Sequence, residues 1–114
     1  MDSLAPIAIA KALDGLALRA AATAENIANA NSPNYRAVVV RFEEQLRAAA
    51  ARGADAVRSV TPETTHAPLP ALGGEMRLDL EMATAAQTAM RYAALIDILG
   101  RQIQIDRAVI AGGR

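Results

Sequence analysis

Two long rows of mostly apolar residues, one near each end of the chain, constrain the fold most strongly. In both rows the residues recur at alternating intervals of four and three. The N-terminal row comprises Ile9, Leu13, Leu16, Ala20, Thr23, Ile27 and Ala30, and the C-terminal row comprises Leu78, Met82, Ala85, Ala89, Tyr92, Ile96, Leu99, Ile103, Asp106 and Ile110. This spacing indicates helices that pack lengthwise along a neighbour. We therefore expect an all-α fold in which two long terminal helices pack as an antiparallel hairpin or coiled coil.

Helix-ending residues divide the chain into three segments. Residues 1–35 hold an N-terminal helix, with Ser3 as its N-cap, followed by an Asn-Pro turn. Residues 36–75 combine a short extended and helical stretch with a proline-bearing loop that we expect to be flexible. Residues 76–114 hold the C-terminal helix, which we expect to run from Met76 to Ala111.

The middle segment carries weaker signals than the two ends. Three consecutive valines at 38–40 favour extended structure, and Phe42 and Leu46 share one face of a short helix that ends near Gly53. Prolines and threonines between Ala54 and Gly74 indicate a loop, and we interpret His66 within it as facing solvent. The alternative is that the middle segment folds back as a third helix and covers the C-terminal row from within the chain.

Glycines interrupt both long helices. Gly15 and Gly100 each cost about 1 kcal/mol relative to alanine in a helix interior. We interpret Gly15 as the point where a neighbouring backbone comes close, and Gly100 as a second tight contact. The alternative for Gly15 is a glycine with no structural role.

The turn after the first helix has a chemical cause. Pro33 cannot continue a helix, and Asn34 tolerates the positive φ that such a turn requires. The asparagines at 26, 29 and 31 would satisfy free carbonyls of the last helical turn or bond to another chain. Plain helix termination is the simpler explanation of the same residues.

The C-terminal helix carries more apolar surface than one neighbouring helix can cover. A side row of Leu95, Ile98, Ile105 and Val109 runs beside the C-terminal row. A fully buried side chain of this kind contributes about 1.5–3 kcal/mol, so leaving the rows exposed is costly. Copies of the chain packed side by side would cover them. We predict a helix-packing interface that comprises Ile9, Leu13, Leu16, Met82, Tyr92, Ile96, Leu99, Ile103 and Ile110.

Composition argues against several classes of function. Lys+Arg and Asp+Glu number 12 each, so no excess of basic residues suggests nucleic-acid binding. The chain has no cysteine, which argues against disulfides and thiolate metal sites. No apolar run is long enough for a membrane span, and the Met1-Asp2-Ser3 start is unlike a secretory signal. No nucleophile–base pair or phosphate-binding glycine loop is present. We expect no enzyme, no cofactor, no metal site and no small-molecule substrate.

One stretch resembles a known signature. Residues 26–36 read Asn-Ile-Ala-Asn-Ala-Asn-Ser-Pro-Asn-Tyr-Arg and follow Leu18 and Arg19. They resemble the N-terminal signature of bacterial flagellar axial proteins, approximately N-I-A-N-x-[NS]-T-P-G-Y-[KR], with Ser32 in place of Thr and Asn34 in place of Gly. Both replacements are compatible with the turn. The likeness covers the first 50 or so and the last 40 or so residues of the chain.

The C-terminal half is most similar to the proximal rod (FlgB) family. That family carries an acidic residue and Met followed ten residues later by Tyr, matched here by Glu81, Met82 and Tyr92. The sequence departs from the family at Thr88, where the family has Asn. The resemblance implies an assembly motif made of Asn26, Ile27, Asn29, Asn31, Pro33, Asn34 and Tyr35.

The resemblance also implies a function. Members are structural subunits of the flagellar basal-body rod that order mainly in the assembled tube, surround the export channel and transmit torque from rotor to hook. They leave the cell interior through the flagellar type III export apparatus, without a cleaved signal peptide, and reach the rod in the periplasmic space. Their partners are further copies of themselves, a FliE-type adaptor and FlgC-type rod subunits. The alternatives are another rod subunit (FlgC-like) or a cytoplasmic helical adaptor or chaperone.

Overall fold

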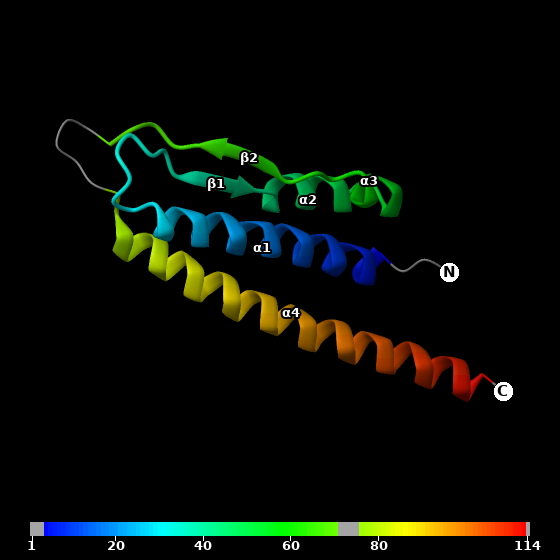
Figure 1. Ribbon diagram of the computed structural model, residues 1–114. Coiled ribbons are helices and arrows are strands. Elements are labelled where there is room, and N and C mark those ends of the chain that lie inside the picture. Colours follow the sequence, from blue (N-terminus) through cyan, green and yellow to red (C-terminus); the bar gives the residue numbers. More distant parts are fainter. Residues whose placement is uncertain (1–3, 71–75, 114) are drawn as a thin grey trace.

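The computed structural model describes residues 4–70 and 76–113 as two long helices with a small folded segment between them. The elements in order are α1 (Leu4–Ala28), β1 (Val38–Arg41), α2 (Glu43–Ala50), α3 (Ala54–Arg58), β2 (Glu63–His66) and α4 (Leu78–Gly112). Figure 1 shows three tiers, with α1 in the middle, α4 on one side, and the strands with α2 and α3 on the other. The predicted pair of long helices packed against each other is confirmed, and they run in opposite directions (Figure 1). The predicted N-cap Ser3 lies outside the described residues.

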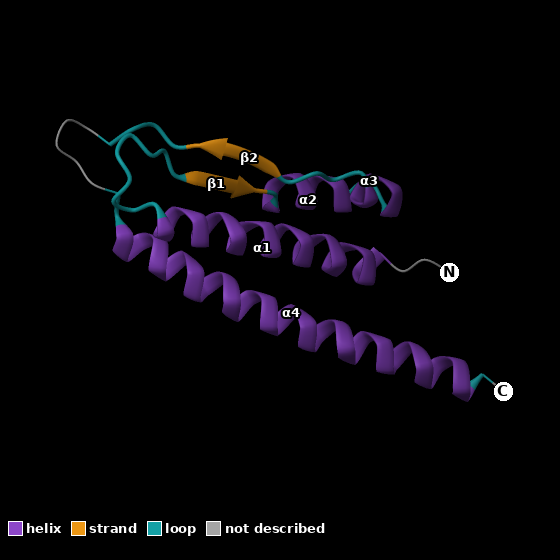
Figure 2. Ribbon diagram, viewed as in Figure 1, coloured by secondary structure: helices purple, strands orange, loops and turns teal. Residues whose placement is uncertain are grey.

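The fold is mainly helical rather than all-α, because a two-stranded sheet lies in the middle segment (Figure 2). β1 and β2 are antiparallel, with Val38 opposite His66 and Arg41 opposite Glu63. The extended structure predicted at the valines is confirmed. The loop predicted from Ala54 to Gly74 is wrong over α3 and β2, and residues 71–74 of it lie outside the described residues.

The prolines misled the loop prediction for a physical reason. Pro62 and Pro68 flank β2 without entering it, so neither removes a hydrogen bond from the sheet. Between them, Thr64 and Thr65 are β-branched residues that suit a strand once the valines of β1 lie alongside. The four residues of β2 form a strand because they pair with the extended valines of β1.

The core lies between α1 and the middle segment. In the main core cluster, Leu16 and Ala22 of α1 pack with Val40 and Phe42 of the middle segment, and Leu95 of α4 packs against the edge of this cluster. A Cβ placed on Gly15 would lie 2.5 Å from the Phe42 ring, so only glycine allows this packing. The close approach predicted at Gly15 is therefore confirmed, but the neighbour is an aromatic side chain rather than backbone.

Gly100 lies in open surroundings. No described heavy atom outside its own helix backbone lies within 4 Å of a Cβ built there, so the tight contact predicted at Gly100 is wrong within a single chain.

The molecule is elongated, 67 × 25 × 14 Å, with a radius of gyration of 17.9 Å. A compact chain of this length would have a radius of about 13 Å.

The alternative in which the middle segment covers the C-terminal row is wrong. The segment folds back over α1, and the row remains exposed at Met82, Ile96, Ile103 and Ile110. Among the described residues, no helix is long and apolar enough to cross a membrane.

Candidate functional site

Asn26, the first asparagine of the predicted motif, is a fully buried hydrogen-bonding centre between three elements. Its Nδ2 donates to the Val38 carbonyl at 2.9 Å and to Glu81 Oε2 at 3.1 Å. Its Oδ1 accepts from the Val38 N–H and from the Tyr35 hydroxyl, both at 2.8 Å. The side chain is 1% exposed, and both polar groups are satisfied inside the chain. Asn26 thus holds α1, β1 and α4 together and has no capacity left for a second chain.

Tyr35 closes this centre from the far side of the turn. Partial burial, with smaller contributions from the carboxylates of Glu25 and Glu81, raises the pKa of the Tyr35 hydroxyl. The hydroxyl therefore keeps its proton at neutral pH and acts as a donor to Asn26. The spacing of nine residues between the two side chains is set by the turn itself.

The turn is built by the other motif residues. Asn29 donates from Nδ2 to the Glu25 carbonyl at 2.9 Å, and the Ser32 hydroxyl donates to Asn29 Oδ1 at 3.0 Å. Asn34 has φ 59°, the left-handed conformation that was predicted for it. Asn31 and Pro33 are exposed, and Ile27 is half-buried. The predicted motif is therefore one structural unit with a buried polar side and a solvent-facing tip.

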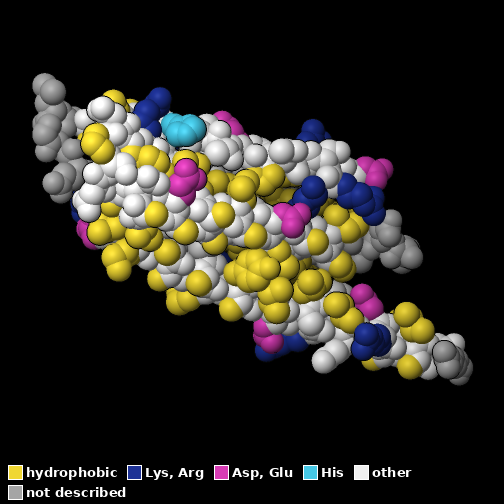
Figure 3. All heavy atoms as spheres, in the orientation of Figure 1, with side chains coloured by type: hydrophobic (Ala, Val, Ile, Leu, Met, Phe, Trp, Pro, Cys, Tyr) yellow, Lys and Arg dark blue, Asp and Glu magenta, His cyan; other side chains and the backbone are white. Residues whose placement is uncertain are grey.

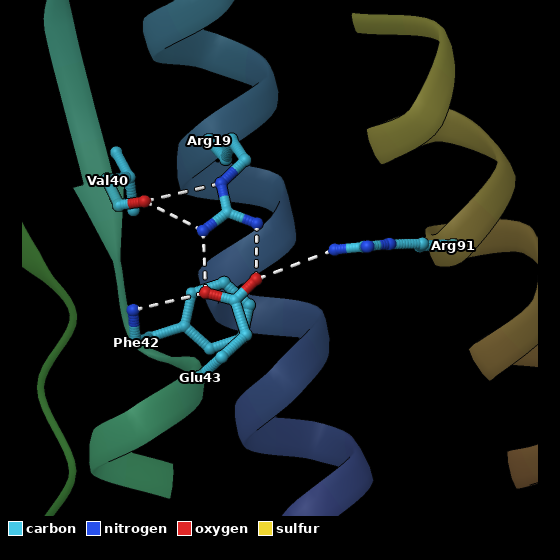
Figure 4. A network of polar contacts seen from close by, with 5 residues as sticks. All are labelled: Arg19, Val40, Phe42, Glu43 and Arg91. Carbon is cyan, nitrogen blue, oxygen red and sulfur yellow. Dashed lines mark hydrogen bonds and ion pairs between the residues drawn. The ribbon is translucent and has the colours of Figure 1, made fainter. Parts of the chain in front are cut away.

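A second polar cluster was missed by sequence reasoning. Arg19 donates two hydrogen bonds to Glu43, at 2.6 and 2.7 Å, and two to the Val40 carbonyl, at 2.7 and 3.3 Å (Figure 4). Its guanidinium carbon lies 4.9 Å from the centre of the Phe42 ring, a cation–π distance. Arg91 of α4 reaches the same carboxylate at 3.6 Å (Figure 4). This bidentate pairing lowers the pKa of Glu43 to about 2.

Arg19 and Asn26 together cover the outer edge of β1. They lie seven residues apart, two turns along one face of α1. Their targets, Val38 and Val40, lie two residues apart in β1, so their outward backbone groups point the same way. Two side chains of α1 thus take the place of a third strand and protect an edge that would otherwise be open to another chain.

The predicted packing residues divide into a covered and an uncovered set. On α1, Leu13 and Leu16 are buried and Ile9 is half-buried, because the middle segment and α4 lie against them. On α4, Leu99 is half-buried and the other five are exposed. Their exposed fractions are Met82 59%, Tyr92 39%, Ile96 48%, Ile103 43% and Ile110 68%.

The side row of α4 is also largely uncovered. Ile98, Ile105 and Val109 are 47%, 56% and 69% exposed, and only Leu95 packs against the core. Thr88 is the one residue of α4 that is buried, at the point where the helix lies against α1. Figure 3 shows apolar side chains gathered between the α2 tier and α4 and continuing to the C-terminal end of α4. The chain therefore presents a long apolar face that it does not cover itself.

Two apolar grooves flank the contact between α1 and α4. The α2 groove, about 470 Å³, is lined by apolar residues of three helices with charged residues among them: Ala12, Leu16, Phe42, Glu43, Leu46, Arg47, Ala50, Arg91, Ala94 and Leu95. The alanine groove, about 530 Å³, is lined by Leu16, Ala17, Ala20, Ala24, Ile27, Ala85, Thr88, Ala89, Tyr92 and Ala93. Small residues in such grooves permit close approach of another helix. Both grooves suit a helical partner more than a polar ligand.

The sequence was compared with models of protein families and with curated proteins. No protein-family model matches the chain, and no curated protein matches it.

Proposed function

We propose that the chain is a structural subunit of the bacterial flagellar basal-body rod, of the proximal rod (FlgB) type. In this role it polymerises around the export channel and transmits torque from rotor to hook. The observation that carries the proposal is the combination of an axial-protein motif at residues 26–36 with an α4 whose apolar rows are exposed. A subunit that is complete only among copies of itself needs such a surface.

The buried motif supports a role in shaping the subunit. Asn26 and Tyr35 fix the direction in which the chain leaves α1, and Asn26 ties that turn to Glu81 on α4. A rigid turn sets the angle between the two helices and hence the faces that each copy presents. In this proposal the motif acts through subunit geometry, and the exposed rows of α4 make the contacts between copies.

The partners follow from the same proposal. They are further copies of the chain, a FliE-type adaptor, FlgC-type rod subunits and the flagellar type III export apparatus. The site of action is the rod in the periplasmic space, reached through that apparatus without a cleaved signal peptide. The chain would complete its order within the assembled tube, where neighbouring copies cover α4.

Export and complementation test this function together. The chain is expressed in a flagellated bacterium made non-motile by deletion of its own proximal rod gene, with and without a working flagellar export gate. We expect gate-dependent secretion and restored swimming. Secretion without rescue, combined with rescue of a strain that lacks another rod gene, would assign the chain to a FlgC-like subunit instead. Retention inside the cell in both backgrounds would contradict the proposal and favour a cytoplasmic adaptor or chaperone.

Variants of the turn sharpen the same test. Tyr35→Ala removes the hydroxyl that bonds Asn26, and Pro33→Gly loosens the turn, so both should reduce swimming more than His66→Ala does. His66 is exposed on β2 and serves as the matched control. Equal swimming by the three variants would contradict a role of the turn in assembly.

A further inference from the structure

The C-terminal end of α4, residues 99–112, is exposed throughout except at Leu99 and Gln102, which are half-buried. It would span about 21 Å at 1.5 Å per residue. Ile103, Ile105, Val109 and Ile110 on it are between 43% and 69% exposed. The whole chain exposes 7821 Å², roughly a third more than a compact monomer of its mass. Four of the large apolar side chains that the chain leaves exposed lie on this end.

The α2 groove offers an apolar seat of the matching kind. Its floor consists of Leu16 and Phe42, and its walls carry Leu46 of α2 with Ala94 and Leu95 of α4. An amphipathic helix binds such a groove through side chains at positions i and i+7, as Ile103 and Ile110 are placed. The groove and the end of α4 are different surfaces of one chain, and no contact between them is possible within it, because Leu95 itself lines the groove.

Charge distinguishes the α2 groove from the alanine groove. At the α2 groove, Glu43 is already neutralised by its bidentate pair with Arg19, so the nearby Arg91 leaves this margin positive. On the end of α4, Asp106 lies between Ile103 and Ile110 in the same row, whereas Arg101 and Arg107 lie outside that row. The lining of the alanine groove contains no charged residue to meet a carboxylate.

We propose that residues 99–112 of one copy dock into the α2 groove of a second copy, with Asp106 facing Arg91. This contact joins two different surfaces, so it is head-to-tail, and a pair of copies still has one free groove and one free end. Repetition of the contact builds an open chain or a tube rather than a closed dimer. The inference rests on the proposed function, since it specifies how one rod subunit joins the next.

Mixing two blocked variants tests the head-to-tail arrangement. Ala94→Arg fills the groove at an exposed position, and Ile110→Arg disables the end. Ala86→Arg, at an exposed α4 position outside both grooves, is the matched control. Circular dichroism confirms that each variant keeps its helix content, and sedimentation velocity gives the mass of each species.

The expected masses are distinct for each arrangement. The parent chain and Ala86→Arg form species that grow with concentration, whereas Ala94→Arg and Ile110→Arg alone stay monomeric. A 1:1 mixture of these two forms a species of twice the monomer mass and grows no further, because the intact end of one fills the intact groove of the other. A mixture that stays monomeric, or a parent chain that stays monomeric at all concentrations, would overturn the proposal.

The charge pair has its own measurement. Asp106→Asn in the variant that supplies the end should weaken the two-variant complex up to about fivefold, the effect of an exposed ion pair, and reduce its dependence on salt. Unchanged affinity and unchanged salt dependence would remove Asp106 from the contact. Because purified chains are used, a failed complex with normal export would contradict only this contact. A normal complex without export would contradict only the rod function.

Discussion

The region around Asn26 and Arg19 on α1 contrasts with the C-terminal end of α4, although both lie on helices with the same repeat. In the first region, two side chains of α1 bond to outward backbone groups of β1, and Leu13, Leu16 and Thr23 of the N-terminal row are buried. In the second, both apolar rows face outward. The repeat is the same, so what differs is the neighbour. The middle segment folds over α1 and leaves α4 packed mainly against α1.

The comparison separates stability from assembly. Residues that hold the subunit together gather on α1 and the middle segment, where neighbours are already present. Residues that would join subunits gather on α4, where neighbours are missing. Substitutions on α1 and the middle segment should therefore change mainly the free energy of unfolding. Substitutions on the exposed rows of α4 should change mainly self-association.

The largest expected difference in the free energy of unfolding is between a variant at Phe42 and one at Ile110. Phe42→Ala empties a buried site beneath Arg19 and should lower the free energy of unfolding by about 3–5 kcal/mol. Ile110→Ala, at a 68% exposed site, should stay within about 0.5 kcal/mol. Denaturant unfolding of the dilute chain measures both. Equal losses would erase the difference between the two regions.

Next in size is the loss of Asn26. Asn26→Ala leaves the N–H and carbonyl of Val38 without the partners that they have in the folded chain, at a cost of about 1–3 kcal/mol for an unsatisfied buried group. Asn31→Ala is the matched control, because Asn31 is exposed on the same turn. The same unfolding experiment compares them. If the two variants unfolded alike, Asn26 would not be the centre of this region.

Alanine substitutions at the two helix glycines should change the free energy of unfolding in opposite directions. Gly15→Ala drives a methyl group into the Phe42 ring, and overpacking of about 1–3 kcal/mol should exceed the gain of about 1 kcal/mol in helix propensity. Gly100→Ala meets nothing within 4 Å and should stabilise the dilute chain by about 1 kcal/mol. Thermal unfolding shows the two signs. A stabilised Gly15→Ala variant would mean that the ring does not lie against this glycine.

The smallest expected effect is the pH dependence of the Glu43 pair. Because pairing lowers the pKa of Glu43 to about 2 from 4.5, its contribution to stability is present above pH 4.5 and is lost as pH falls towards 2. The carboxylate is 45% exposed, so after screening by solvent the contribution is on the order of 1 kcal/mol. Glu43→Gln should remove this part of the acid dependence. An identical pH profile of unfolding in both proteins would contradict the pairing.

Periodicity predicted the two helices and their contact because a row repeated over several turns outweighs local exceptions. It did not predict which neighbour covers each row, since that depends on where the middle segment folds. The positive φ of Asn34 and the extended valines followed from single-residue preferences. The Arg19–Glu43 pair spans 24 residues, and no local pattern marks it. The short strand β2 was missed because it depends on its pairing with β1.

Hydrogen exchange at single-amide resolution tests the central claim most directly, namely that α4 carries apolar surface that only another copy covers. In dilute solution we expect amides of α1 near Asn26 to be protected and those of residues 99–112 to exchange rapidly. At concentrations where copies associate, residues 99–112 should become protected while α1 changes little. Equal and strong protection of both regions in the dilute monomer would contradict the account.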